Sequence, residues 1–196
     1  MTTLFLDLDG VLADFDGAFP VVFGMDHKSM ADEDMWEKIN AHPSFFRDLP
    51  PMPGALEFFR KVEHLDPIIL TACPKNNYAH VAKQKREWVR EHLSDDVLVL
   101  PVMGGSNKPL FMRHEGDILI DDFIRNVNAW EGAGGVGILH HDFALTEALL
   151  RGRMLAGRVN AGHWERAVQD GINRIYNKHA AQLIAARANE LAEVVL

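Results

Sequence analysis

The feature that most limits how this chain can fold is a series of five short apolar runs separated by longer helical patterns. The runs are rich in Leu, Ile and Val and span residues 3–7, 67–71, 97–102, 117–121 and 136–140. Such runs are typical of strands buried on both faces. Helical patterns lie between them at about residues 55–64, 78–92, 109–113 and 124–131. The alternation predicts an α/β fold with a doubly wound parallel sheet, in which ligands bind beyond the carboxyl ends of the strands.

Two segments interrupt this alternation. Residues 15–53 contain a helical pattern of their own, in which Ser29 and Asp32 have a spacing like that of a capping box. From about His163 onward, apolar residues recur at helical spacing. We therefore expect a catalytic core made of residues 1–14 and 54–150, a small helical cap of residues 15–53, and a C-terminal helical extension of residues 151–196. The extension either packs on the core or forms the contact of a homodimer.

The charge balance restricts the partners of the chain. Its 20 Lys and Arg residues against 28 Asp and Glu residues leave a formal net charge of −8. This acid excess argues against a nucleic-acid polymer and against an anionic membrane surface, because both are bound through basic residues. No apolar run approaches the roughly 18 residues that span a bilayer, and no basic segment opens the chain as in a secretory signal. We expect a cytoplasmic protein whose anionic partner, if it has one, is small.

Two pairs of acidic residues follow predicted strands. Asp7 and Asp9 end the first run, and alternate residues of an extended chain point to the same side. Two carboxylates this close repel unless a cation lies between them or one takes a proton, and Mg²⁺ prefers such oxygen ligands. Asp121 and Asp122 end the fourth run, whose strand can lie beside the first. A solvated turn or a helix cap would explain either pair alone, but the coincidence of both favours a metal site.

A hydroxyl and an ammonium group complete the candidate site. Thr71 ends the second run, and Lys108 opens the helical pattern that follows a glycine-rich stretch. These are the groups that bind a phosphoryl group, although a strand-end cap and a surface lysine are the alternative interpretations. We interpret the nearby basic residues as a solvated helix face: Lys83, Lys85, Arg86 and Arg90.

Together these positions resemble a known superfamily. Asp7-x-Asp9, Thr71, Lys108 and Asp121-Asp122 resemble, in this order, the four motifs of the haloacid dehalogenase-like (HAD) phosphohydrolases. The longer strings DLDGVLADFDGAF, PSFFRDLPPMPGALEFF and LIDD resemble the 5′(3′)-deoxyribonucleotidase family, and the likeness covers about residues 3–142. The resemblance implies a Rossmann-like HAD core and a phosphoric monoester hydrolase.

The resemblance also implies a mechanism. Asp7 would be the nucleophile that takes the phosphoryl group as an aspartyl-phosphate. Asp9 would protonate the leaving alcohol and then deprotonate the attacking water. Thr71 and Lys108 would bind the oxygens of the transferred phosphoryl group. A carboxylate that attacks a phosphate dianion meets charge repulsion, so the chemistry needs the neutralising lysine and a metal ion.

The cofactor implied by the resemblance is Mg²⁺. It would be held by the carboxylate of Asp7, the main-chain carbonyl of Asp9 and the carboxylate of Asp122, with Asp121 in a supporting role.

The substrate pocket follows the same resemblance. In the related nucleotidases, aromatic rings of the cap sandwich the base, and Phe15 and Phe46 are the main candidates here. Phe19, Trp36 and Phe45 are further candidates, for which a place in the core of the cap is the alternative. Ala72 stands where the family has Ser, which implies one missing phosphate contact. Lys75 is similar in position to a lysine of the family's substrate loop and is a candidate substrate contact; a solvated lysine at a helix start is the alternative.

The function predicted from the sequence is therefore Mg²⁺-dependent hydrolysis of a small phosphorylated metabolite, a nucleoside monophosphate and foremost a deoxyribonucleoside monophosphate. One alternative is a HAD phosphatase for another small ester, such as a sugar phosphate. Another is a binding protein that keeps the HAD fold without catalysis.

Overall fold

The chain divides into two compact units, residues 1–147 and residues 148–196. A computed structural model describes residues 2–156. The first unit is therefore described almost completely, and the second only as far as helix α6 (Phe143–Ala156) extends into it. Most of the expected C-terminal extension, residues 157–196, lies outside the described residues, and so do its two alternative roles, packing on the core and contact in a homodimer.

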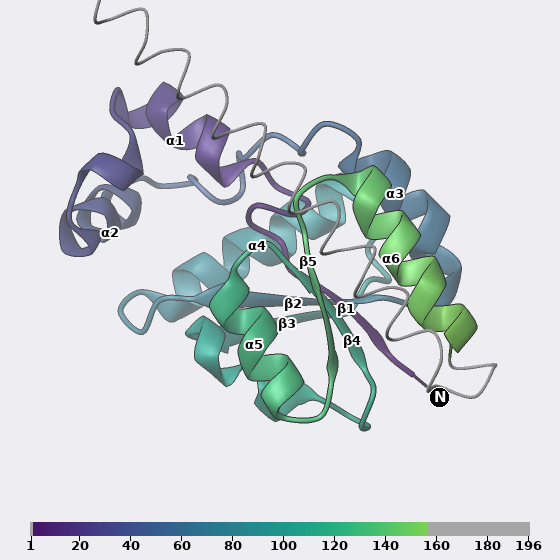
Figure 1. Cartoon of the computed structure of the whole chain (residues 1–196). Helices are drawn as coiled ribbons and strands as arrows, with labels where there is room; N and C mark the ends of the chain where they lie inside the picture. The colour runs from purple at the N-terminus through teal and green to yellow at the C-terminus, as the bar shows by residue number, and fades with distance from the viewer. Residues whose placement is uncertain (1, 157–196) are drawn as a thin grey trace, which may run out of the picture. The chain divides into compact units, whose positions relative to one another are not determined.

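The first unit is built on a sheet of five parallel strands. These are β1 (Leu4–Leu6), β2 (Ile68–Cys73), β3 (Val99–Met103), β4 (Ile118–Asp121) and β5 (Val136–Leu139). Their order is β3-β2-β1-β4-β5, so the chain winds outward from β1 to β3 and then returns to place β4 on the other side of β1 (Figure 1). The doubly wound sheet predicted from the apolar runs is confirmed, and its order reverses at β1, where such sheets bind ligands.

Helices join the strands close to where the sequence patterns predict them. They are α3 (Ala55–Val62), α4 (Tyr78–His92) and α5 (Ile124–Gly132), with a short 3-10 turn, η2 (Glu63–Leu65), after α3. The stretch expected to be a helix at 109–113 differs. It is part of a 3-10 helix, η3 (Gly105–Phe111), so Lys108 lies inside the helix and does not open it. Its bonds join residues three apart: the main-chain N–H of Asn107 donates to the carbonyl of Gly104 at 3.1 Å, and that of Met112 to the carbonyl of Pro109 at 3.2 Å.

The interior of the sheet fixes the relative positions of its central strands. Phe5 of β1 is fully buried and packs edge-to-face on Trp130 of α5, with ring centroids 5.1 Å apart. The indole Nε1 of Trp130 donates to the main-chain carbonyl of Asp117 at 2.8 Å, immediately before β4. Because β1, β2 and β4 share this core, their carboxyl ends are held side by side.

A helical insert follows β1, as expected for residues 15–53. It contains α1 (Phe15–Phe23), the 3-10 turn η1 (His27–Ser29) and α2 (Asp32–Ala41), which stand apart from the sheet in Figure 1. Phe19 and Phe45 are buried and pack against one another, so the insert has an aromatic core of its own. None of the helices described in residues 2–156 has the length and apolar character needed to cross a membrane.

The predicted capping box in this insert is wrong. Helix α2 starts after Ala31, which has no side chain able to cap it, and the Ser29 hydroxyl instead donates to the carbonyl of Asp26 at 2.7 Å. Asp26 and Ser29 thereby close a separate turn, because short polar side chains also bond readily to nearby backbone.

Candidate active site

The loop after β1 places Asp7 beside the end of β4. The main-chain N–H of Asp7 donates to the carbonyl of Ile120 at 2.9 Å, so the pairing of the two strands continues up to the acidic residues. Gly10 then turns with φ of +73°, and a Cβ added there would lie 2.2 Å from Asp122 Oδ2. The tight approach of this loop to Asp122 therefore requires glycine.

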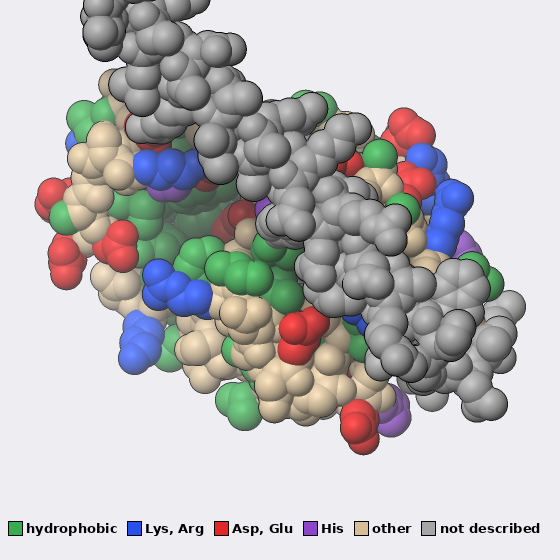
Figure 2. All heavy atoms as spheres, in the orientation of Figure 1, with side chains coloured by type: hydrophobic (Ala, Val, Ile, Leu, Met, Phe, Trp, Pro, Cys, Tyr) green, Lys and Arg blue, Asp and Glu red, His purple; other side chains and the backbone are tan. Residues whose placement is uncertain are grey.

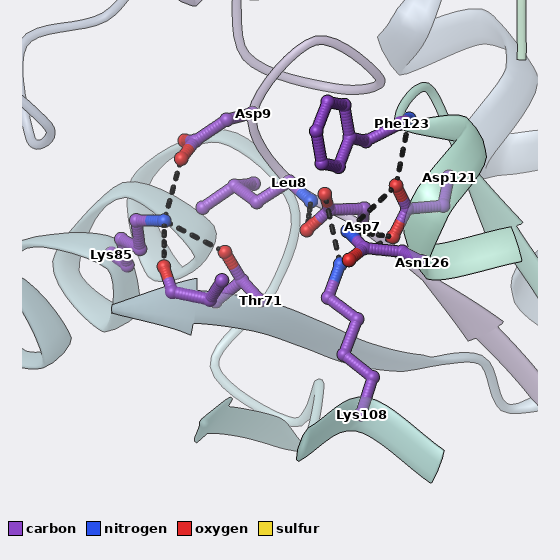
Figure 3. Close-up of polar contacts among 10 residues, drawn as sticks. Asp7, Leu8, Asp9, Thr71, Lys85, Lys108, Asp121, Phe123 and Asn126 are labelled. Carbon is purple, nitrogen blue, oxygen red and sulfur yellow. Dashed lines mark hydrogen bonds and ion pairs between the residues drawn. The ribbon is translucent and has the colours of Figure 1, made fainter. Parts of the chain in front are cut away.

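Three carboxylates and one ammonium group form the centre of the site, and Figure 3 shows Asp7, Asp121 and Lys108 among them. Asp7, Asp121 and Asp122 each offer an oxygen, and these oxygens all lie within 4.8 Å of one another. Lys108 is fully buried, with its Nζ 2.9 Å from Asp7 Oδ2 and 2.5 Å from Asp121 Oδ2. Three carboxylates around one lysine leave an excess of negative charge that a divalent cation would neutralise.

Protein donors contact both oxygens of Asp7 and of Asp121, and Asp121 has the larger set of donors. Its Oδ1 accepts from the main-chain N–H of Phe123 at 2.9 Å, and Asn126 Nδ2 lies 3.1 Å from both oxygens. Asp121 is therefore arranged to hold Lys108, and Asp7 and Asp122 are the other two acids of the cluster. Asn126 is not among the site residues predicted from the sequence, although it follows the acid pair by only four residues.

The pKa values in the cluster reflect this crowding of charge. Burial, followed by the charges of Asp7 and Asp121, raises the pKa of Asp122 to about 8. Burial also raises the pKa of Asp121, Asp7 adds to the rise, and Lys108 opposes it. For Lys108, burial acts to lower the pKa, but the two acids beside it outweigh burial and raise it. Lys108 is therefore protonated, and a proton or a metal ion is needed to offset the repulsion between Asp122 and the other two acids.

A second lysine, Lys85 of α4, forms the other half of the site. It is only 1% exposed, and its Nζ lies 2.6 Å from Asp9 Oδ2, 2.8 Å from Thr71 Oγ1 and 2.6 Å from the Ala72 carbonyl oxygen. The interpretation of the basic residues of α4 as a solvated face is therefore wrong for Lys85.

The spacing of the apolar residues in α4 indicates that Lys85 is buried. Lys85 lies four residues after Val81, three before Trp88 and four before Val89, all of which are buried. It is thus in phase with the apolar stripe that faces the sheet.

The two oxygens of Asp9 have different surroundings. Oδ2 bonds to Lys85, whereas Oδ1 is buried and is the one buried side-chain nitrogen or oxygen without a hydrogen-bond partner among the described residues. Burial raises the pKa of the Asp9 carboxyl; Lys85 opposes this rise and Asp7 adds to it. A carboxyl with a raised pKa and an unpartnered oxygen suits proton exchange with a ligand.

The expected substrate contacts lie around this half of the site. Phe15 of the cap is half-buried and stacks on Phe46, with ring centroids 6.2 Å apart. Phe46 is only 1% exposed, and Lys85 Nζ lies 4.8 Å from its ring centroid, so Phe15 offers the more accessible ring. Lys75 is exposed in the turn after β2. Figure 2 shows a hollow between the cap and the sheet, with hydrophobic walls and an acidic group in its depth.

Known nucleotidases resemble this chain in sequence. A family profile described as "5' nucleotidase, deoxy (Pyrimidine), cytosolic type C protein" matches residues 1–147. A putative 5'(3')-deoxyribonucleotidase from Bordetella pertussis is 34% identical over 139 residues, which cover 61% of this chain and 73% of that protein. The human cytosolic-type 5'(3')-deoxyribonucleotidase is 31% identical over 141 residues, which cover 60% of this chain and 68% of that protein.

Among solved structures, a D,D-heptose 1.7-bisphosphate phosphatase from B. bronchiseptica, complexed with magnesium and phosphate, covers 77% of this chain and 99% of its own at 14% identity. Its TM-score is 0.45. The family match covers three quarters of the sequence, including the whole described site. The chain belongs to the 5' nucleotidase, deoxy (pyrimidine), cytosolic type C family, a family of phosphomonoester hydrolases.

Proposed function

We propose that this protein is a Mg²⁺-dependent phosphomonoesterase that hydrolyses nucleoside monophosphates, foremost deoxyribonucleoside monophosphates, through an aspartyl-phosphate on Asp7. One observation carries the proposal: Asp7 lies at the end of β1 with the buried ammonium of Lys108 2.9 Å away and two further acids within 4.8 Å. A carboxylate in this setting can approach a phosphate ester that a bare acidic cluster would repel.

The residues present fit a magnesium ion. Asp7 and Asp122 would supply carboxylate oxygens and Asp9 its main-chain carbonyl. Asp121, which is held by Lys108 and Asn126, would have a supporting role beside these ligands. Mg²⁺ accepts a small number of carboxylates and completes its shell with water and substrate oxygens. When bound, the ion supplies positive charge opposite the phosphoryl oxygens.

The side chains of the protein divide the two chemical steps between them. In the first step, an Asp7 oxygen forms a bond to phosphorus, the bond to the leaving oxygen breaks, and that oxygen takes a proton from Asp9. In the second step, water attacks phosphorus, its proton passes to Asp9, and inorganic phosphate leaves with the Asp7 carboxylate restored. Lys108 and the Thr71 hydroxyl bind the transferred oxygens, because both are donors at the same edge of the sheet.

The proposed substrate class rests on the family and on the cap. The relatives from Bordetella pertussis and human are named deoxyribonucleotidases, and aromatic rings such as Phe15 stack well on bases. We propose that residues 15–53 are the substrate cap on a core of residues 1–14 and 54–150, and that the protein acts in the cytoplasm on a small nucleotide.

A substrate panel tests this function. The purified protein is assayed with Mg²⁺ against deoxyribonucleotides, ribonucleotides and sugar phosphates, with the Asp7→Asn variant as a control for contaminating phosphatases. We expect deoxyribonucleoside monophosphates to have the highest kcat/KM. Faster hydrolysis of sugar phosphates would overturn the substrate class, and no hydrolysis of any ester would favour a HAD-fold binding protein.

A further inference from the structure

Lys85 is a buried charge whose surroundings consist mainly of oxygen acceptors. Its ammonium contacts Asp9 Oδ2 at 2.6 Å, Thr71 Oγ1 at 2.8 Å and the Ala72 carbonyl oxygen at 2.6 Å (Figure 3). These three acceptors come from the loop after β1 and from β2, whereas Lys85 comes from α4. The lysine thus joins two candidate catalytic groups from a helix that the reaction itself does not use.

The contacts of Lys85 leave a specific atom of each group free. Asp9 Oδ2 is bound, whereas Asp9 Oδ1 is buried without a partner among the described residues. The Thr71 oxygen accepts from Lys85, because an ammonium has no lone pair to offer, so the hydroxyl hydrogen stays available to another acceptor. Both free positions are those that a phosphate ester would use in the proposed mechanism.

We propose that Lys85 is a positioning residue that holds the Asp9 carboxyl by Oδ2 and so presents Oδ1 as the atom that exchanges protons with the substrate. The proton moves from Oδ1 to the leaving oxygen in the first step, and the Asp9 carboxylate that remains is countered by Lys85. In the second step Oδ1 takes the proton of the attacking water. This inference rests on the proposed function and adds to it the atom that transfers the proton and the residue that orients it.

A structural ion pair that only docks α4 on the sheet is the competing explanation. The positioning role and the structural role predict different effects of removing Lys85 on substrates with different leaving groups. An alkoxide such as the sugar oxygen of a nucleotide must be protonated as it departs, whereas p-nitrophenolate is a good leaving group without a proton. Misplacement of Asp9 therefore slows nucleotide hydrolysis selectively, while a loss of folded protein lowers both activities equally.

The test compares Lys85→Met with Lys83→Met, a matched control that removes the same charge from the same helix at a side chain that is 73% exposed. For Lys85→Met we expect kcat on the best nucleoside monophosphate to fall about 100-fold or more, and kcat on p-nitrophenyl phosphate to fall less than about tenfold. Lys83→Met should leave both unchanged. An equal loss on both substrates, or no loss, overturns the role of Lys85.

A double-variant cycle covers the case in which Lys85→Met does not fold. The Asp9→Asn/Lys85→Met protein lacks both charges of the pair and so avoids an unpaired buried carboxylate. If Lys85 acts through Asp9, adding Lys85→Met to Asp9→Asn lowers nucleotide kcat less than about threefold. A full multiplicative loss overturns the inference. If the wild type hydrolyses neither ester, the proposed function itself fails, which is a different result from an equal loss in the variant.

Discussion

Replacing Asp122 with Asn is expected to stabilise the metal-free protein and to remove its response to Mg²⁺. Oxygens of Asp7, Asp121 and Asp122 lie within 4.8 Å of one another. At an effective dielectric constant of about 20, two unit charges at such a distance repel by about 3.5 kcal/mol. Part of the Asp122 residue surface reaches solvent, although its carboxyl is desolvated enough to raise its pKa, and Lys108 offsets part of the repulsion. We therefore expect a gain of about 1–2 kcal/mol in the free energy of unfolding. For a chain of this size that is roughly 2–8 °C in Tm.

The gain should depend on pH in a defined direction. The pKa of Asp122 rises from its ordinary 3.8 to about 8 in the folded protein, so the folded state holds this proton more tightly than the unfolded state. Wild-type stability from this group is therefore fully present below the ordinary pKa and is lost as pH rises toward 8. The advantage of Asp122→Asn should be absent near pH 4 and complete above about pH 8.

Thermal melts of the wild type and of Asp122→Asn, in EDTA and in saturating Mg²⁺, measure these effects. Glu115→Gln is the control, because it removes one formal charge from an exposed loop position. Mg²⁺ should raise the Tm of the wild type and of Glu115→Gln but not that of Asp122→Asn. The reasoning is refuted if Asp122→Asn melts at or below the wild type in EDTA at alkaline pH, or if Mg²⁺ raises the Tm of both equally.

Three further substitutions have distinct expected outcomes. Asp7→Asn should lower kcat on every phosphate ester at least about 1000-fold while Tm stays within a few degrees, and substantial residual activity would exclude Asp7 as the nucleophile. Gly10→Ala should weaken the Mg²⁺-induced rise in Tm, because its Cβ would lie 2.2 Å from Asp122 Oδ2 at a φ of +73°; an unchanged Mg²⁺ titration would contradict the tight approach. Asp117→Ala should cost about 3–5 kcal/mol in urea unfolding, because its buried carboxylate accepts from the main-chain N–H groups of Thr3, Arg113 and His114. The kcat of the folded Asp117→Ala protein should not change, and a lost kcat would show that this acid belongs to the active site.

Much of the fold was predictable because its signals are local. Five apolar runs became five parallel strands, and the helical patterns became helices within a few residues of their expected ends. The exception was η3, which is a 3-10 helix and begins before Lys108. The acid pairs also followed from local order, since each directly follows a strand and parallel strands end at one edge of the sheet.

The contacts between polar side chains join residues that are far apart in the chain, and they were not predicted correctly from the sequence. Lys85 was assigned to solvent because its neighbours on α4 are charged, yet it is buried against Asp9, 76 positions away in the chain. No sequence pattern indicated Asn126, although its side-chain amide donates to Asp121. Phe46 was predicted to stack on a base, a role that stays untested, while the structure places it under Lys85.

The sequence by itself therefore determined the strands and helices and the family. Apolar periodicity specifies the strands and helices, and the acidic, hydroxyl and lysine motifs specify the superfamily. The tertiary structure decided which charges are paired. A buried ammonium is stable only where oxygens from other elements surround it, and Lys85 finds them in Asp9, Thr71 and the Ala72 carbonyl. That set of acceptors exists only after β1, β2 and α4 have packed together, so no pattern within a single segment specifies it.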